Sequence, residues 1–291
     1  MINHKNIKNF NKHHKHYRDK GFVLIKNFFN KKDCLKAAKW LEAKNHNRLA
    51  KSWTEQEPGV PLAVYFQVHK GNTPIAKLAR DNSMLDFASK LVNDKVYIYS
   101  SKVNLKAAWC GTVEYYHQDL VYWRDRGYPR EDMLSTMIML NSHNIYNAPL
   151  HIFPGTHKLG FIKHEPFINI NGLAKFMIPP KQLNKLKKKH GLKIIEAEPG
   201  DVLFFHMGMV HGSGHNISSN SRMVVLSQLN TIGNIPKNVN KNAVKYNIAR
   251  AKRELVEAKR KLKWFNKKYL TQIKSKKLTF FAPIAKEEKK Y

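Results

Sequence analysis

The sequence predicts a mainly β fold with flanking helices. Six short strand-like runs lie between residues 95 and 230, where apolar and polar side chains alternate and Gly, Pro and Asn turns separate the runs. Such a series is typical of an antiparallel sandwich or barrel. A chain of 291 residues is long enough to bury the core of one such domain. The runs are KVYIYSSKVNLKAA, VEYYHQDLVYW, DMLSTMIMLN, APLHIFPG, LKIIEAEPGDVLFFHM and SRMVVLSQLN.

The segment before these runs predicts a strand followed by helices. GFVLIKNF, residues 21–28, has the composition of a short strand, and Asn30 is the candidate N-cap of the amphipathic helix that follows it. Two further helical segments within residues 73–93 meet near Asp81. Further along the chain, Pro199 begins a tight turn between two predicted strands.

We expect a single domain over residues 21–236, flanked by two polar segments. Residues 1–20 are interpreted as a basic arm, and residues 237–291 as a basic helix and tail packed on the domain. The domain divides into a helical part, a β core and, within that core, a lid or insert: residues 30–93, 95–232 and 156–190.

The chain carries 52 Lys and Arg against 21 Asp and Glu, a net charge of +31. A field of this sign attracts nucleic acid, anionic lipid or acidic substrates. However, Lys, Asn and Ile are abundant throughout the chain, and a coding bias toward A and T would produce the same composition. On that interpretation the positive charge is surface lysine spread over the whole protein. A clustered basic patch would favour the first interpretation, and both stay open.

Composition also restricts the class and the compartment. No apolar run approaches the ~20 residues that span a bilayer, so the sequence predicts no membrane span. The first 20 residues are basic but lack the apolar stretch of a secretory signal. Only two cysteines, Cys34 and Cys110, are present, which is consistent with a reducing compartment. We therefore expect a cytoplasmic protein.

One strand-like run, YYHQDLVYW at residues 115–123, contains a histidine and an aspartate two positions apart. Residues i and i+2 of a strand point to the same face, about 7 Å apart. His117 and Asp119 would then offer a nitrogen and a carboxylate oxygen to one divalent metal. Two ligands alone are weak evidence, because His-x-Asp arises by chance in many chains and can be the solvated face of a strand, so a third ligand is needed.

His211 is the candidate third ligand, and Arg222 follows it eleven residues later in MVHGSGHNISSNSR. Two histidines and one carboxylate leave three positions of a metal open, which is the arrangement of non-haem Fe(II) oxygenases. Those positions can hold a bidentate 2-oxo acid and dioxygen. The far carboxylate of the oxo acid needs a cationic partner inside a barrel, and the planar fork of Arg222 matches it.

Three stretches, YHQDLVYW, LHIFPGTHKLG and HGSGHNISSNSR, together resemble the phytanoyl-CoA dioxygenase family of Fe(II)/2-oxoglutarate oxygenases, which includes ectoine hydroxylase. The resemblance spans roughly residues 20–230 and implies a double-stranded β-helix, a jelly-roll, cupin-like core. It places the iron ligands on His117, Asp119 and His211, and the 2-oxoglutarate arginine on Arg222. Related halogenating enzymes have a small residue in place of the carboxylate, so Asp119 implies hydroxylation.

The resemblance also suggests residues around the co-substrate and the substrate. Lys102, Asn104 and Lys106 share one face of a predicted strand; by likeness to ectoine hydroxylase, Asn104 contacts 2-oxoglutarate and Lys102 lies near it. Thr136 is expected to reach the oxo acid, and Trp123 the substrate. The alternatives are a solvated polar face for the strand, an ordinary strand hydroxyl for Thr136 and a core tryptophan for Trp123.

Two histidines near these stretches are assigned to the scaffold. His206 lies an odd number of residues before His211, which on a continuous strand would place it on the opposite face. His157, in PGTHKLG, is expected to fix its own loop.

The implied reaction uses Fe(II), 2-oxoglutarate and dioxygen to hydroxylate an unactivated C–H bond of a small molecule, with release of succinate and carbon dioxide. The positive charge favours an anionic substrate. One alternative is a nucleic-acid-directed oxygenase or a basic nucleic-acid-binding protein that uses the helix predicted over residues 240–270. Another is a barrel that kept the fold and lost iron, against which the intact ligand set argues.

Overall fold

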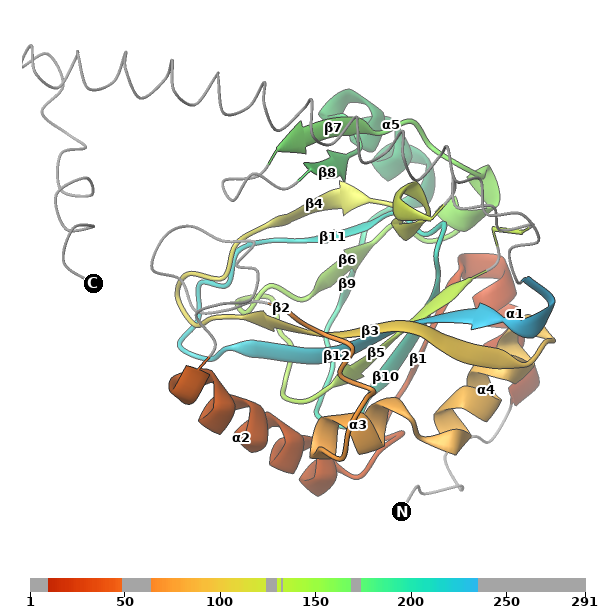
Figure 1. Cartoon of the computed structure of the whole chain (residues 1–291). Helices are drawn as coiled ribbons and strands as arrows, with labels where there is room; N and C mark the ends of the chain where they lie inside the picture. Colours follow the sequence, from red (N-terminus) through yellow and green to blue (C-terminus); the bar gives the residue numbers. More distant parts are fainter. Residues whose placement is uncertain (1–9, 49–63, 124–129, 132, 169–173, 235–291) are drawn as a thin grey trace, which may run out of the picture.

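Two antiparallel sheets face one another at the centre of the molecule (Figure 1). The computed structural model describes residues 10–48, 64–123, 130–131, 133–168 and 174–234. The larger sheet contains, in spatial order, β1 (Phe22–Ile25), β10 (Val202–His206), β5 (Leu134–Met139), β12 (Arg222–Thr231), β3 (Val96–Lys106) and β2 (Val64–Phe66). The smaller sheet contains β4 (Glu114–His117), β11 (His211–Ser213), β6 (Leu150–Ile152) and β9 (Lys193–Ile195). The predicted β fold is confirmed as a jelly-roll core.

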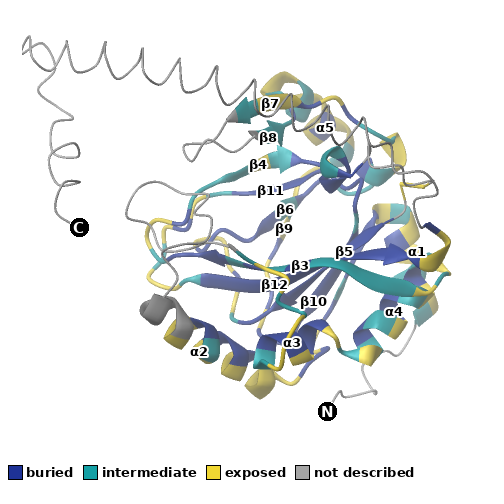
Figure 2. Ribbon diagram, viewed as in Figure 1, coloured by how far each residue is buried: buried dark blue, intermediate teal, exposed yellow. Residues whose placement is uncertain are grey.

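Side-chain alternation divides the core into two apolar layers. On β5, Met137 and Met139 point inward and pack with Leu150 and Ile152 of the smaller sheet. Leu134 and Ile138 point outward and pack against the helices. Figure 2 colours most of the ribbon of the central strands as buried. The register of the sheet therefore determines which residues can face the space between the sheets.

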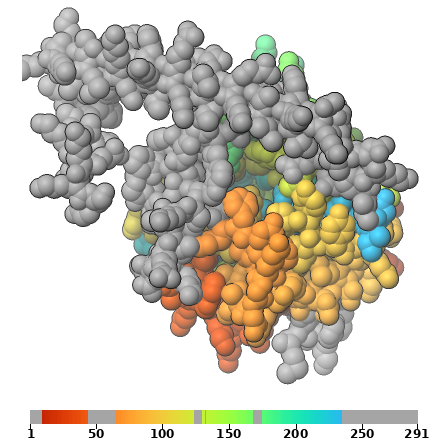
Figure 3. Space-filling view, in the orientation of Figure 1, coloured from red at the N-terminus to blue at the C-terminus, as the bar shows by residue number. Residues whose placement is uncertain are grey.

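Four helices cover the outer face of the larger sheet: α1 (Phe10–Lys20), α2 (Lys31–Arg48), α3 (Pro74–Ala79) and α4 (Asn82–Val92). The expected cap at Asn30 is present, and a second cap lies at Asp81, where the two helical segments meet. The Asn30 side chain accepts a hydrogen bond from the Lys32 N–H (2.8 Å), and the Asp81 side chain accepts one from the Met84 N–H (3.0 Å). In Figure 3, β2 and α3 form an outer surface on this side of the molecule.

Residues 10–20 form helix α1, so the arm predicted over residues 1–20 is wrong for its second half. The helix buries Tyr17, and the Phe10 ring meets the Phe87 ring of α4 edge-on, with centroids 5.7 Å apart. Two aromatic residues seven positions apart lie on one helical face, which gives this polar segment a surface to bury. Gly21 ends the helix with φ +80°.

The segment predicted as a lid or insert forms a third layer. It contains η4 (Thr156–Leu159), the hairpin β7 (Glu165–Ile168) and β8 (Ala174–Met177), and helix α5 (Pro180–His190). Ile162, Ile178 and Leu186 from this layer pack with Phe153 and Val210 beside the smaller sheet. The segment therefore contributes to the core, and movement as a lid stays a prediction.

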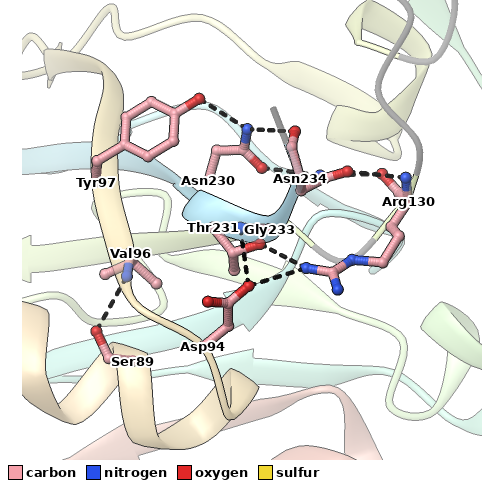
Figure 4. Close-up of polar contacts among 9 residues, drawn as sticks. All are labelled: Ser89, Asp94, Val96, Tyr97, Arg130, Asn230, Thr231, Gly233 and Asn234. Atoms are coloured by element: carbon pink, nitrogen blue, oxygen red, sulfur yellow. Dashed lines mark hydrogen bonds and ion pairs between the residues drawn. The ribbon is translucent and has the colours of Figure 1, made fainter. Parts of the chain in front are cut away.

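A polar network closes the far end of β12 (Figure 4). The Arg130 Nη2 donates to Asp94 Oδ2 (3.1 Å) and to Thr231 Oγ1 (2.7 Å). The backbone N–H of Arg130 donates to Asn234 Oδ1 (2.8 Å), and Asn234 Nδ2 donates to Asn230 Oδ1 (2.8 Å). These bonds tie the end of β12 to the segment that enters β5.

None of the helices in the described part of the chain has the length and apolar character needed to span a bilayer. The basic helix and tail predicted over residues 237–291 lie outside the described residues.

Candidate metal and co-substrate site

His117, Asp119 and His211 meet at one place in the space between the sheets. His117 ends β4 and pairs in register with His211, which begins β11. Asp119 Oδ1 lies 3.6 Å from His117 Nε2 and 3.8 Å from His211 Nε2. All three side chains are buried, and one ligand atom from each lies within 4.8 Å of the others. The predicted ligand set therefore converges.

The backbone path that brings His117 and Asp119 together differs from the predicted continuous strand. β4 ends at His117, and Asp119 begins the short 3-10 helix η2 (Asp119–Tyr122), so the two ligands do not share a strand face. The intervening Gln118 is fully buried and breaks the strand. Its side-chain amide bonds three backbone groups: Gly160 O (2.9 Å), Gly208 O (2.7 Å) and Ile162 N–H (2.8 Å). These long-range bonds pin the turn that carries Asp119.

Backbone carbonyls fix both imidazoles in the tautomer that a metal requires. His117 Nδ1 lies 2.7 Å from Tyr115 O, and His211 Nδ1 lies 2.9 Å from Met209 O. Because a carbonyl only accepts, each Nδ1 carries a hydrogen, and in the neutral ring each Nε2 presents a lone pair toward Asp119.

Electrostatics keep the carboxylate ionised. Burial acts to raise the pKa of Asp119, but the hydrogen bond from His117 and the charges of both imidazoles hold the pKa well below its ordinary value. Burial and the neighbouring His117 lower the pKa of His211 to about 4. Against the lowering effect of burial, the hydrogen bond to Asp119 and the nearby carboxylates raise the pKa of His117, so a metal ion would displace its proton on binding. An anionic oxygen beside two imidazole nitrogens is a donor set that suits a divalent iron ion. The residues present therefore fit the metal that the sequence predicts.

Arg222 lies on the inner face of β12, as alternation with Val224 and Leu226 of the inner layer requires. Its side chain is 3% exposed and Nη1 donates to Ala148 O (2.7 Å), while Nε has no hydrogen-bond partner among the described residues. Burial lowers the pKa of Arg222 to about 10, so the guanidinium remains charged at neutral pH. A buried cation with an unsatisfied donor fits the carboxylate of an oxo acid.

The β3 residues predicted near the co-substrate lie on this same face. Lys106 pairs with Arg222, Asn104 with Val224 and Lys102 with Leu226, so their side chains point between the sheets rather than into solvent. Asn104 Oδ1 is buried without a partner in the described structure. Lys106 is also buried; its Nζ donates to Gly214 O (2.7 Å) and to Thr112 O. The sequence does not single out Lys106 as a site residue, although Lys106 lies on the same strand face as Lys102 and Asn104.

The prediction for Thr136 is wrong. Thr136 pairs with Phe204 and Ser227, and alternation with Leu134 places it on the helix-covered face, away from the triad. Its neighbour Ser135 points inward instead, and Ser135 Oγ donates to Asp119 Oδ2 (2.9 Å).

Trp123 lies immediately after η2 and is 9% exposed. Its ring meets the Tyr99 ring edge-on, with centroids 4.6 Å apart, and it packs in a cluster with Leu120, Met133 and Met207. These contacts are those of the core alternative, while contact with a substrate stays a prediction.

His206 and His157 lie away from the triad and support the scaffold. His206 Nδ1 accepts a hydrogen bond from the Gly208 N–H (2.9 Å), and its ring lies 5.3 Å from that of His157. His157 Nε2 lies 3.1 Å from Arg18 O and so joins its loop to α1. Burial, followed by the charge of His157, lowers the pKa of His206 to about 4.

This lowered pKa predicts acid sensitivity. Between pH 6.5 and about 4 the unfolded chain binds a proton at His206 that the folded chain does not, so stability falls as the pH drops through this window. In His206→Asn the amide oxygen can still accept the hydrogen bond from the Gly208 N–H, but the side chain has no titratable group. We expect the melting temperature of this variant to fall less between pH 7.5 and pH 5 than that of the wild type. The exposed His215→Asn is the control, and equal slopes for all three proteins would contradict the assignment.

Comparison with known proteins places this site in a family. The model of the phytanoyl-CoA dioxygenase family (PhyH) matches residues 17–224. The chain is 28% identical to the ectoine dioxygenase of Bordetella bronchiseptica over 237 residues, 76% of each protein. It is 26% identical to the L-proline trans-4-hydroxylase of Streptomyces griseoviridis over 179 residues, which is 58% of this chain and 67% of that protein.

A solved structure shares the fold. The crystal structure of EctD from S. alaskensis with 2-oxoglutarate and 5-hydroxyectoine matches with a TM-score of 0.66 and 26% identity, covering 83% of each chain. A second structure of EctD holds bound Fe. By sequence, the alignment with the ectoine dioxygenase of Sphingopyxis alaskensis, at 29% identity, spans 58% of each protein. Because the family model matches most of the chain, the chain belongs to the phytanoyl-CoA dioxygenase family of Fe(II)/2-oxoglutarate-dependent oxygenases.

Proposed function

We propose that this protein hydroxylates an unactivated C–H bond of a small molecule that carries a carboxylate or a comparable hydrogen-bond acceptor. The observation that carries the proposal is the meeting of His117, Asp119 and His211 in the barrel that also buries the partly unsatisfied guanidinium of Arg222. This arrangement supports the use of a metal and an oxo acid together.

The three ligands have defined roles in this proposal. Asp119 Oδ1 and the Nε2 atoms of His117 and His211 would hold Fe(II). Iron, when bound with 2-oxoglutarate and dioxygen, supplies the oxidising chemistry, which releases succinate and carbon dioxide. The protein binds and orients the reactants and excludes water, because the ligand residues are 5–6% exposed.

Arg222 would bind the far carboxylate of 2-oxoglutarate through two parallel N–H···O bonds. Lys106, directly opposite on β3, adds a second buried cation, and Asn104 adds an amide on the same face. Two cations on one enclosed face favour a dicarboxylate over a monocarboxylate. Lys102 lies near enough to lower the pKa of Asp119 through its charge, after the larger effects of burial and the imidazoles.

His164 supports a substrate with an acceptor group. Its Nε2 accepts a hydrogen bond from the Gln118 N–H (3.0 Å), so Nδ1 must carry the hydrogen of the neutral ring. Burial lowers the pKa of His164 to about 4, and the charges of His117 and His211 act in the same direction. The nearby backbone of Ile162 opposes this shift. Within the described residues Nδ1 makes no hydrogen bond of normal geometry, although the Ile162 backbone lies near it, so this donor would be available to a substrate oxygen.

The relatives named for ectoine and proline hydroxylation supply the first compounds to test. We expect a small cyclic amino acid or a similar zwitterion to stimulate succinate release from 2-oxoglutarate under Fe(II) and air. Each succinate should be matched by one product heavier by a single oxygen atom, detected by mass spectrometry. A panel of such compounds that leaves succinate release unchanged, while long acyl thioesters stimulate it, would overturn the substrate class.

The nucleic-acid alternative depends on residues 240–270, which lie outside the described structure, and it stays a prediction. Oxidation of a small molecule in the absence of nucleic acid would argue against it. Activity in the cytoplasm likewise stays a prediction, since it rests on composition alone.

A further inference from the structure

We propose that Ser135 is a positioning residue that presents Asp119 to the metal through one oxygen only. The inference rests on the proposed function, because it concerns how the iron ligand is held. The two carboxylate oxygens of Asp119 have different partners: Oδ1 faces the Nε2 atoms of both histidines, at 3.6 and 3.8 Å, whereas Oδ2 accepts the 2.9 Å hydrogen bond from Ser135 Oγ. The orientation of the carboxylate is therefore set by the protein.

Ser135 can set this orientation because it lies on a rigid element. It sits in the middle of the larger sheet, where its backbone pairs with Phe205 of β10 on one side and Gln228 of β12 on the other, and its side chain is fully buried. Asp119, in contrast, begins a single turn of 3-10 helix. An ionised carboxylate only accepts hydrogen bonds, so the Ser135 hydroxyl is the donor. A fixed strand thus orients a ligand carried on a short turn.

Loss of this bond should change the metal site rather than the fold. In Ser135→Ala, Oδ2 is buried without its partner and can turn toward the metal, because carboxylates bind metals through either one oxygen or two. Chelation by both oxygens would occupy a position that the oxo acid needs. We expect the variant to bind metal but to bind 2-oxoglutarate about 10-fold or more weakly, within the range found when partners of metal ligands are removed.

Co(II) serves as the probe, because its visible absorption reports coordination without dioxygen chemistry. Apo-protein is titrated with Co(II) and then with 2-oxoglutarate, for the wild type, Ser135→Ala, Ser135→Thr and Thr136→Val. Ser135→Thr keeps the hydroxyl and should stay near the wild type. Thr136→Val is the matched control, since it removes a hydroxyl one residue away on the opposite face.

An altered Co(II) spectrum and weakened 2-oxoglutarate binding in Ser135→Ala alone would support the proposal. A wild-type spectrum and affinity in Ser135→Ala would overturn it. Failure of the wild type itself to bind Co(II) would instead reject the proposed function. If Ser135→Ala does not fold, Ser135→Cys replaces it in the test. Its thiol is a weaker donor, so the Co(II) spectrum and the 2-oxoglutarate affinity should change in the same direction.

Discussion

Asp119→Ala should lose substrate-stimulated succinate release by more than about 100-fold, because changes to the partners of metal ligands already cost 10–100-fold and this change removes a ligand. Asp119 supplies the only carboxylate of the converging set. Without it, two imidazoles are left to hold the metal, and no negative charge offsets the cation in a buried site. The measurement is succinate formation with the best substrate, together with Fe(II) affinity by anaerobic titration.

The exposed Asp86→Ala, on helix α4, is the matched control and should behave as the wild type. Circular dichroism should show that Asp119→Ala keeps its β structure, because the core layers do not depend on this carboxylate. Full activity in folded Asp119→Ala would reject the metal assignment, and with it the proposed function.

Arg222→Ala should raise the KM for 2-oxoglutarate by about 100-fold and leave metal affinity nearly unchanged. Hydrogen bonds to charged groups contribute about 1.5–3 kcal/mol each, and a loss of about 2.7 kcal/mol corresponds to a factor of about 100. Arg222→Lys keeps the charge but lacks the planar fork, so its KM should lie between the other two. Steady-state kinetics with varied 2-oxoglutarate distinguish the three proteins.

Arg18→Ala provides the control for removal of a positive charge, because the Arg18 side chain is 67% exposed. An unchanged KM in Arg222→Ala would show that another group anchors the co-substrate, and Lys106 would then be the first to test. A fall in kcat with KM unchanged would instead place Arg222 in a structural role.

The residue types in three short motifs were enough to predict the candidate metal ligands. Local sequence patterns could not predict the backbone geometry that brings these ligands together. YYHQDLVYW has the composition of an unbroken strand, and nothing in it indicates that the strand ends at His117. The break depends on Gln118, whose three partners lie more than 40 residues away in the chain. Contacts of this separation are invisible to local periodicity.

The error at Thr136 has a different physical cause. β5 is buried on both faces, so its sequence LSTMIM lacks the alternation that would reveal which side chains point inward. Two adjacent hydroxyl residues were therefore indistinguishable, and only the register with β10 and β12 selects Ser135. The arm that proved to be helix α1 was obscured in a similar way, because only Phe10 and Tyr17 interrupt its polar composition.

The two-sided burial of the central strands also suggests how the protein could be engineered. Residues 137, 139, 224 and 226 pack in the apolar layer between the sheets, while their sequence neighbours pack against the helices. Substitutions on opposite faces share few contacts, so their effects on stability should be close to additive. A combinatorial library confined to those four positions would repack the layer behind the site while leaving the helix-covered face of the sheet largely untouched.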